Sequence, residues 1–158
     1  MTDSRNDATR YAFRLLGYRG RSEKELRERL VRRGFSEDAA SGTLAYLREA
    51  GFINDGALAL DLKRQAVGQK KLGYRAARSF MEKRGLPRDL IESTLGYDED
   101  VELENAGNLL DKKRKSIGNY VTTKERKRLY DYLLRKGFSS SVINKALRDF
   151  EQDEGDEG

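Results

Sequence analysis

A short pattern centred on glycine occurs three times along the chain at nearly constant spacing. In each copy a large apolar residue stands four positions before the glycine, a basic residue directly before it and another large apolar residue directly after it. The glycines are 51 and 52 residues apart, and a leucine follows each of them by ten positions. A fixed period of this length is typical of tandem helical repeats. The copies occupy residues 30–36, 81–87 and 133–139.

The central glycines, Gly34, Gly85 and Gly137, are predicted to be structural turn residues. A glycine just past a helix end adopts the left-handed conformation that other residues avoid, and the apolar residues around it close the turn. In the first copy these apolar residues are Leu30 and Phe35. The basic residue before each glycine suits the negative end of the helix dipole. A serine or proline two positions after the glycine begins the next helix.

Each copy therefore contains two helices, and an apolar stripe before them indicates a third. In the second copy this stripe is Ala59, Leu62 and Ala66. No segment alternates between apolar and polar residues as a half-buried strand would. We predict an all-α fold of three tandem three-helix repeats forming an elongated, curved array, because units this small must share apolar faces. The expected boundaries are 1–52, 53–97 and 98–150, followed by a disordered acidic tail at 151–158.

The residue types that most catalytic and metal sites need are missing from this chain. It has no Cys and no His, which excludes disulfides, Cys-ligated zinc, imidazole ligands and Ser-His-Asp triads. The acidic cluster at residues 98–104 could gather Mg²⁺, but acidic residues more commonly begin a helix. We expect no enzymatic activity, no cofactor and no metal. No apolar run could span a membrane and no signal peptide is evident, so we expect a cytoplasmic protein.

Positive charge is concentrated in two windows. The net charge is +5, but residues 149–158 carry six acids and no base, so the rest of the chain is far more basic. Residues 63–88 hold nine bases against Glu82 alone, and residues 111–136 hold ten bases against three acids. Charge runs are commonly just solvated surface, but windows of nearly one sign favour a polyanionic partner. The candidate contact residues are Lys63, Arg64, Lys70, Lys71, Arg75, Arg78, Lys112, Lys113, Arg114 and Lys115.

The order of motifs resembles the RecX family of recombination regulators. The similarity extends from about Ala12 to Phe150, and the family is built from three tandem three-helix repeats. The segments that carry it are Arg21 to Leu26 and Arg33-Gly34-Phe35 in the first repeat, and Gly51 to Ala59, Leu72-Gly73-Tyr74-Arg75 and Lys83 to Pro87 in the second.

The resemblance implies a bacterial regulatory protein that binds the RecA recombinase filament on single-stranded DNA. It implies inhibition of the recombinase, ATPase and co-protease activities, and thereby modulation of DNA repair. The partners expected are the RecA filament and single-stranded DNA, with double-stranded DNA as a further candidate, no membrane and a monomeric chain. The ten candidate bases could then contact recombinase as well as DNA.

The sequence leaves open which repeat contacts recombinase and which contacts DNA, and whether inhibition acts by capping the filament or by binding in its groove. An alternative interpretation is a stand-alone helical nucleic-acid-binding protein of the helix-turn-helix type. A pair of helices joined by a short glycine turn also describes that motif.

Overall fold

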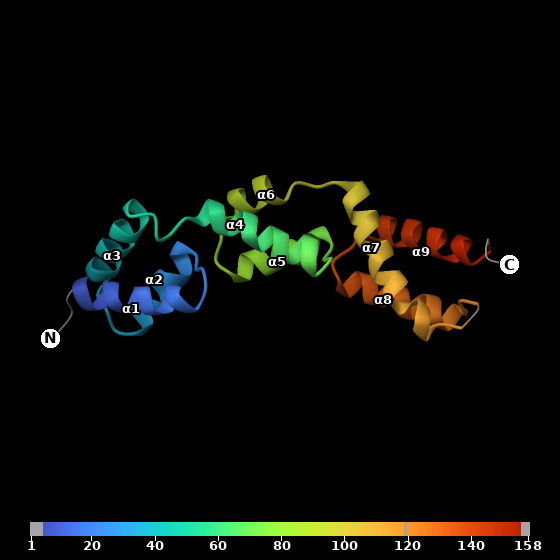
Figure 1. Ribbon diagram of the computed structural model, residues 1–158, viewed down its shortest axis with the longest axis horizontal. Coiled ribbons are helices and arrows are strands. Elements are labelled where there is room, and N and C mark those ends of the chain that lie inside the picture. The colour runs from blue at the N-terminus through green and yellow to red at the C-terminus, as the bar shows by residue number, and fades with distance from the viewer. Residues whose placement is uncertain (1–4, 119, 156–158) are drawn as a thin grey trace. The chain divides into compact units, whose positions relative to one another are not determined.

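The computed structural model describes residues 5–118 and 120–155, and within these ranges the chain is helical with no strand. The predicted all-α class is therefore confirmed, and the α-helices follow one another in three groups of three (Figure 1). In chain order the elements are α1 (Arg5–Tyr18), α2 (Glu23–Arg32), α3 (Glu37–Glu49), α4 (Asp55–Lys63), η1 (Arg64–Gln69), α5 (Tyr74–Lys83), α6 (Arg88–Leu95), α7 (Glu99–Lys113), η2 (Arg114–Ser116), α8 (Thr123–Arg135) and α9 (Ser140–Gly155).

Packing divides the chain into two compact units. The first unit comprises Met1–Leu62 and Met81–Thr94, and the second comprises Lys63–Phe80 and Leu95–Gly158. The middle group of helices is thus shared, with α4 and α6 in the first unit, and η1 and most of α5 in the second. Each unit consequently holds one complete three-helix group together with part of the middle group.

Each complete group of helices has its own apolar core. In the first unit, α1 packs on α3 and α2 through small alanines such as Ala8 and Ala12 and through fully buried Leu26 and Leu44. In the second unit, α7 lies along α9 and α8, and Phe138 is completely buried among leucine and isoleucine side chains (Figure 1). The helical spacing of apolar residues predicted these faces, because residues three and four apart lie on one side of a helix.

The three predicted glycine turns are present, each directly after the second helix of its group. The φ angles of Gly34, Gly85 and Gly137 are 104°, 82° and 97°. In the first turn the Gly34 N–H donates to the Val31 carbonyl at 3.0 Å and the Phe35 N–H donates to the Leu30 carbonyl at 3.1 Å. The other two turns contain the same two backbone bonds. This is the Schellman arrangement, in which two carbonyls at the helix end gain donors that the helix itself cannot supply.

Two of these turns also pack against the start of a helix in the preceding group. The backbone of Gly137 lies against the first turn of α5, where Gly73 N–H donates to the Lys136 carbonyl at 2.8 Å. The backbone of Gly85 lies against the start of α2, so that an added Cβ there would be 2.6 Å from Ser22 Oγ. The Arg84 guanidinium next to it donates to the Gly20 carbonyl at 2.9 Å. The glycines therefore serve both as turns and as sites of close approach between successive groups.

A carboxylate reinforces each of these two junctions. Asp55 at the start of α4 accepts the Glu23 N–H at 3.0 Å, and Glu102 in α7 accepts the Tyr74 N–H at 3.2 Å. Both donors belong to the first turn of a helix, where the N–H groups have no partner within the helix. Burial raises the pKa of both carboxyls above their usual range, while the backbone hydrogen bond opposes that rise.

The structure differs from expectation at the end of the acidic tail and at the end of α4. We expected disorder from residue 151, but α9 continues to Gly155, and residues 156–158 lie outside the described part of the chain. An ion pair of 2.9 Å between Glu151 and Arg126 joins the start of this extension to α8. The helix α4 ends at Lys63, and the chain continues as the π-helix η1, in which Ala66 is buried.

Candidate nucleic-acid interface

All ten candidate bases lie in the second unit. Those from the first charged window surround η1 and the start of α5, and those from the second window lie at the end of α7 and in η2. Six of the ten side chains are exposed, and the other four are partly buried. The exposed six are Arg64, Lys70, Arg75, Lys112, Lys113 and Lys115.

An irregular turn places Lys70 and Lys71 between η1 and α5. Lys70 N–H donates to the Gln65 carbonyl at 2.9 Å, a π-type bond, and Leu72 N–H donates to the Ala66 carbonyl at 2.9 Å. Lys71 between them has φ 56°, the left-handed conformation that costs an ordinary residue roughly 1–2 kcal/mol. This turn places two adjacent lysines at the end of η1. A regular α-helix continued through the same residues would have placed these lysines differently.

Three of the candidate bases lie over aromatic rings. The distance from Lys70 Nζ to the Phe80 ring centroid is 4.6 Å, and from Lys113 Nζ to the Tyr132 ring centroid it is 4.7 Å. The Arg114 guanidinium lies 4.1 Å from the ring centroid of Phe150, which is buried. Such contacts stabilise a cation by about 0.5–1 kcal/mol at exposed sites. Arg114 also pairs with Asp111 at 3.6 Å, so it has a structural role in closing the core.

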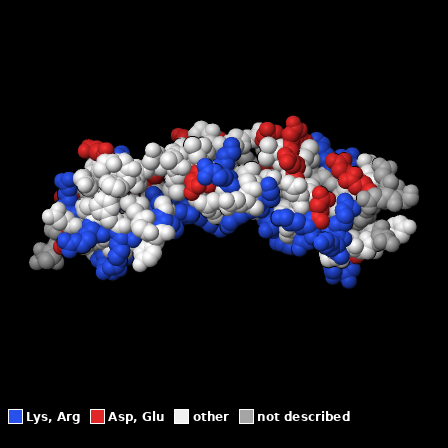
Figure 2. Space-filling model, in the orientation of Figure 1, with Lys and Arg blue, Asp and Glu red and all other residues white. Residues whose placement is uncertain are grey.

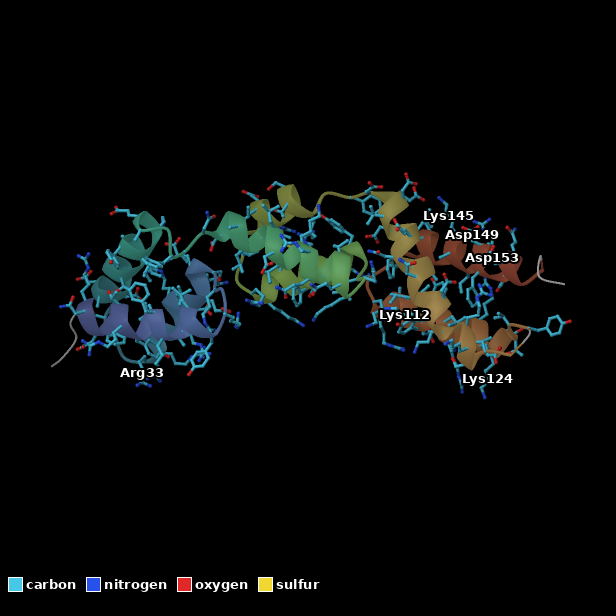
Figure 3. The ribbon with its side chains drawn as sticks, in the orientation of Figure 1. Arg33, Lys112, Lys124, Lys145, Asp149 and Asp153 are labelled. Carbon is cyan, nitrogen blue, oxygen red and sulfur yellow. The ribbon has the colours of Figure 1, made fainter. Side chains whose placement is uncertain are left out.

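Acidic and basic side chains separate within the second unit. Figure 2 shows blue side chains gathered over α8 and the end of α7, and red side chains over the start of α7 and over α9. Lys145, Asp149 and Asp153 lie in a row along α9, apart from Lys112 and Lys124 on the basic side (Figure 3). A polyanion would therefore be attracted to the α8 side and repelled from the exposed side of α9.

The structure adds basic residues that sequence reasoning did not single out. Arg128 and Arg135 on α8 fall inside the second charged window, one helical turn on either side of Tyr132. In the first unit, the ring of Tyr11 lies 5.1 Å from the Arg33 guanidinium and 6.0 Å from that of Arg14. The helical spacing around Tyr132 was a usable signal in the sequence. The pairing of Tyr11 with Arg33 was not, because it depends on how α1 packs on the end of α2.

The acidic cluster at the start of α7 has structural roles. Asp98 caps the helix by accepting the N–H groups of Asp100 at 3.0 Å and Val101 at 3.4 Å. Glu99 pairs with Lys145, and Glu102 caps α5. Across residues 5–118 and 120–155 no group of three or more acidic side chains is arranged to hold a metal ion. In the same part of the chain no helix has the length and apolar character needed to cross a membrane.

Comparison with known proteins places this arrangement in a family. A family model for the first three-helix domain of RecX matches residues 8–47, and one for the third three-helix domain matches residues 100–147. The regulatory protein RecX of Deinococcus radiodurans is 36% identical over 153 residues, covering 93% of this chain and 72% of that protein. The chain belongs to the RecX family. The domains matched by the two family models correspond to α1–α3 and to α7, α8 and the first half of α9.

Other members of the RecX family agree with this assignment. The regulatory protein RecX of Amycolatopsis mediterranei is 29% identical over 148 residues, covering 90% of this chain and 85% of that protein. The crystal structure of RecX from Lactobacillus salivarius shares the fold with a TM-score of 0.81 at 22% identity, covering 94% of this chain and 97% of that chain. The RecX proteins in these comparisons are regulatory proteins by name, and the helical repeats predicted from the sequence are those of the family.

Proposed function

We propose that this chain regulates DNA repair by binding the RecA recombinase filament on single-stranded DNA and inhibiting its recombinase, ATPase and co-protease activities. Membership of a family of regulatory proteins supports a regulatory role. The observation that carries the proposal is the concentration of all ten candidate bases in one compact unit, with the acidic side chains of α7 and α9 on a different side. The partner would be cytoplasmic, and we propose that this protein is cytoplasmic as well.

The proposed mechanism is occupancy of a phosphate-lined surface. Each Lys or Arg that neutralises a phosphate releases a condensed counterion, and this release drives binding without any sequence preference. A protein held in this way on a recombinase filament would block access of a second DNA strand and of proteins cleaved at the filament. No covalent step is required, which suits a chain without His or Cys.

The alternative is a stand-alone DNA-binding protein that inserts α9 into a duplex groove, as the second helix of a helix-turn-helix does. The pair α8 and α9, joined at Gly137, has the required connection. However, the exposed side of α9 carries Asp149 and Asp153 beside Lys145 and Arg148, so it lacks the predominantly basic surface that phosphates flanking a groove would attract. The charge on α9 therefore favours the filament modulator over the groove reader.

The deciding experiment measures RecA ATPase activity and strand exchange on single-stranded DNA with this protein present at much less than one copy per RecA. A filament modulator inhibits at such ratios, because one bound copy affects many RecA subunits. The control repeats the assay with a large excess of naked single-stranded DNA. A stand-alone binder would inhibit only when it covers the DNA and would lose its effect in that excess. Inhibition of this second kind, or none at all, would reject the proposal.

A further inference from the structure

A groove lies between the end of α7, η2 and α8 within the second unit. Its volume is about 390 Å³, within the range of about 300–1,000 Å³ that holds small ligands. Its apolar floor is formed by Ile117 and Leu129, and cationic side chains stand around it. The lining also includes the aromatic ring of Tyr132 and the cations Lys113, Arg128 and Arg135, together with Ser116, Glu125 and Asp131.

The cations on one wall come from a single face of α8. Arg128, Tyr132 and Arg135 are separated by four and three positions, so their side chains emerge from the same side of the helix. Both arginines are exposed, and neither forms an ion pair with any residue that the structure describes. Of the two acids at the groove, Glu125 is engaged at the helix start, where it accepts the Thr122 N–H at 3.1 Å. Asp131 is the other. The cations outnumber the acids, and the groove attracts anions.

Two lysine ammonium groups lie near the aromatic ring in the groove. Lys113 Nζ lies 4.7 Å and Lys136 Nζ 5.7 Å from the ring centroid of Tyr132. Lys113 is exposed and carries its charge on a flexible stem of four carbons, so it can leave the ring for a nearby anion. A flat apolar group could then lie at the place on the ring that Lys113 leaves, while the Lys113 ammonium binds the negative charge attached to that group.

We propose that this groove binds one nucleotide unit of single-stranded DNA, with flanking phosphates on Arg128 and Arg135 and the base on Tyr132. This inference rests on the proposed function, to which it adds a specific subsite. A nucleotide combines the anion and the flat ring that the groove accommodates. An acidic peptide lacks the ring, and the bases of duplex DNA are stacked on one another and cannot reach it. Base stacking on an aromatic side chain contributes about 1–3 kcal/mol per base.

The first test is a salt titration of binding to an oligothymidylate, with the full chain and without RecA. The double variant Arg128→Gln/Arg135→Gln should reduce the slope of log affinity against log salt by about 1.4, since each phosphate contact contributes about 0.7. The matched control is Lys127→Gln/Arg148→Gln, which removes two exposed charges of the same unit outside the groove lining. Equal slopes in the two double variants would overturn the assignment of phosphates to the groove.

The second test compares the oligothymidylate with an abasic oligomer of the same length. The parent should prefer the oligothymidylate by about 5-fold or more, which corresponds to about 1 kcal/mol for one stacked base. Tyr132→Leu should reduce this preference and leave the salt slope unchanged, whereas Tyr132→Phe should keep both. Circular dichroism and thermal melting check whether Tyr132→Leu remains folded. An unchanged preference in Tyr132→Leu would overturn the role of the ring.

The outcomes separate this inference from the function on which it rests. If a polyglutamate peptide displaces the abasic oligomer and the oligothymidylate equally well, the groove binds acidic chains in general and the inference is wrong. RecA ATPase inhibition is measured with the parent and both double variants. Absence of inhibition by the parent rejects the proposed function, whereas normal inhibition with matching slopes in both double variants rejects only the groove.

Discussion

Gly73 and Gly137 lie backbone against backbone, so that an added Cβ at Gly73 would be 2.5 Å from the carbonyl carbon of Gly137. Gly73 N–H donates to the Lys136 carbonyl at 2.8 Å and Arg75 N–H donates to the Gly137 carbonyl at 3.3 Å, so the contact also satisfies polar groups on both segments. These two hydrogen bonds join the start of α5 to the turn between α8 and α9. This contact holds the lysine pair before α5 close to the third group of helices.

Gly73→Ala should therefore destabilise the protein by about 1–3 kcal/mol, the usual cost of forcing a methyl group into a packed contact. The control is Gly107→Ala in α7, where an added Cβ would have no neighbour within 4 Å. That substitution should stabilise by up to about 1 kcal/mol, because alanine is the better helix former. Urea unfolding gives both values. Equal midpoints for the two variants would contradict the close approach.

The turn glycines should differ in their sensitivity to alanine. Gly34→Ala should cost about 1–2 kcal/mol from backbone strain alone, since no atom lies within 4 Å of the added Cβ. Gly137→Ala should cost more, because its Cβ would lie 2.4 Å from the Cβ and backbone nitrogen of Ala76. Thermal melting of the two variants measures the order. Were Gly34→Ala the more damaging of the two, the assignment of Gly137 as a packing site would fail.

Stability should depend on pH through Glu102, a residue that is only 6% exposed. Burial raises its pKa above the value of 4.5 that the unfolded chain has, with the Tyr74 hydrogen bond opposing. The folded chain then binds more protons than the unfolded chain above pH 4.5, so this group's contribution to stability declines as pH rises through that window. Glu102→Gln lacks this decline.

The measurement is urea unfolding of the parent and Glu102→Gln from about pH 4.5 towards neutrality. The free energy of unfolding of the variant, relative to that of the parent, should increase as pH rises. Glu104→Gln, an exposed carboxylate of the same helix, is the control and should parallel the parent. If the free energy of unfolding of Glu102→Gln falls relative to that of the parent as pH rises, the hydrogen bond outweighs burial at this site.

Neutralising the basic turn and the start of α5 should weaken binding to single-stranded DNA and inhibition of RecA. The quadruple Gln variant should lower the salt slope by as much as about 2.8, because each phosphate that a base no longer neutralises lowers it by about 0.7. A control variant removes four exposed bases from the first unit and should change the slope less. If log affinity falls with log salt at the same slope in the parent and the quadruple variant, this surface does not contact DNA. The quadruple variant replaces Lys70, Lys71, Arg75 and Arg78, and the control replaces Arg5, Arg10, Lys24 and Arg32.

The acidic side of α9 should oppose DNA binding. Asp149→Asn/Asp153→Asn should tighten binding of single-stranded DNA, most strongly at low salt, where screening is weak. Glu151 is kept because its ion pair with Arg126 holds α9 against α8. Fluorescence anisotropy at low and high salt measures the effect. An affinity that stays the same at both salt concentrations would limit these residues to a role in solubility.

Local features of this chain could be predicted well from sequence. The turns at Gly34, Gly85 and Gly137 were predicted because their signals lie within six consecutive residues, and the same applies to the N-cap at Ser22. By contrast, the extension of α9 to Gly155 was missed, because the ion pair that holds it joins two helices distant in the sequence.

The all-α class, the three groups of helices, the turn glycines and the family could be predicted from the amino acids alone, because each depends on residues a few positions apart or on motif order. The packing of Gly137 on Gly73, the capping of α5 by Glu102 and the contact of Lys113 with Tyr132 became visible only in the folded chain. These contacts depend on the rotation of each helix about its own axis. That rotation is set by the fit of whole apolar faces, which no short stretch of sequence contains.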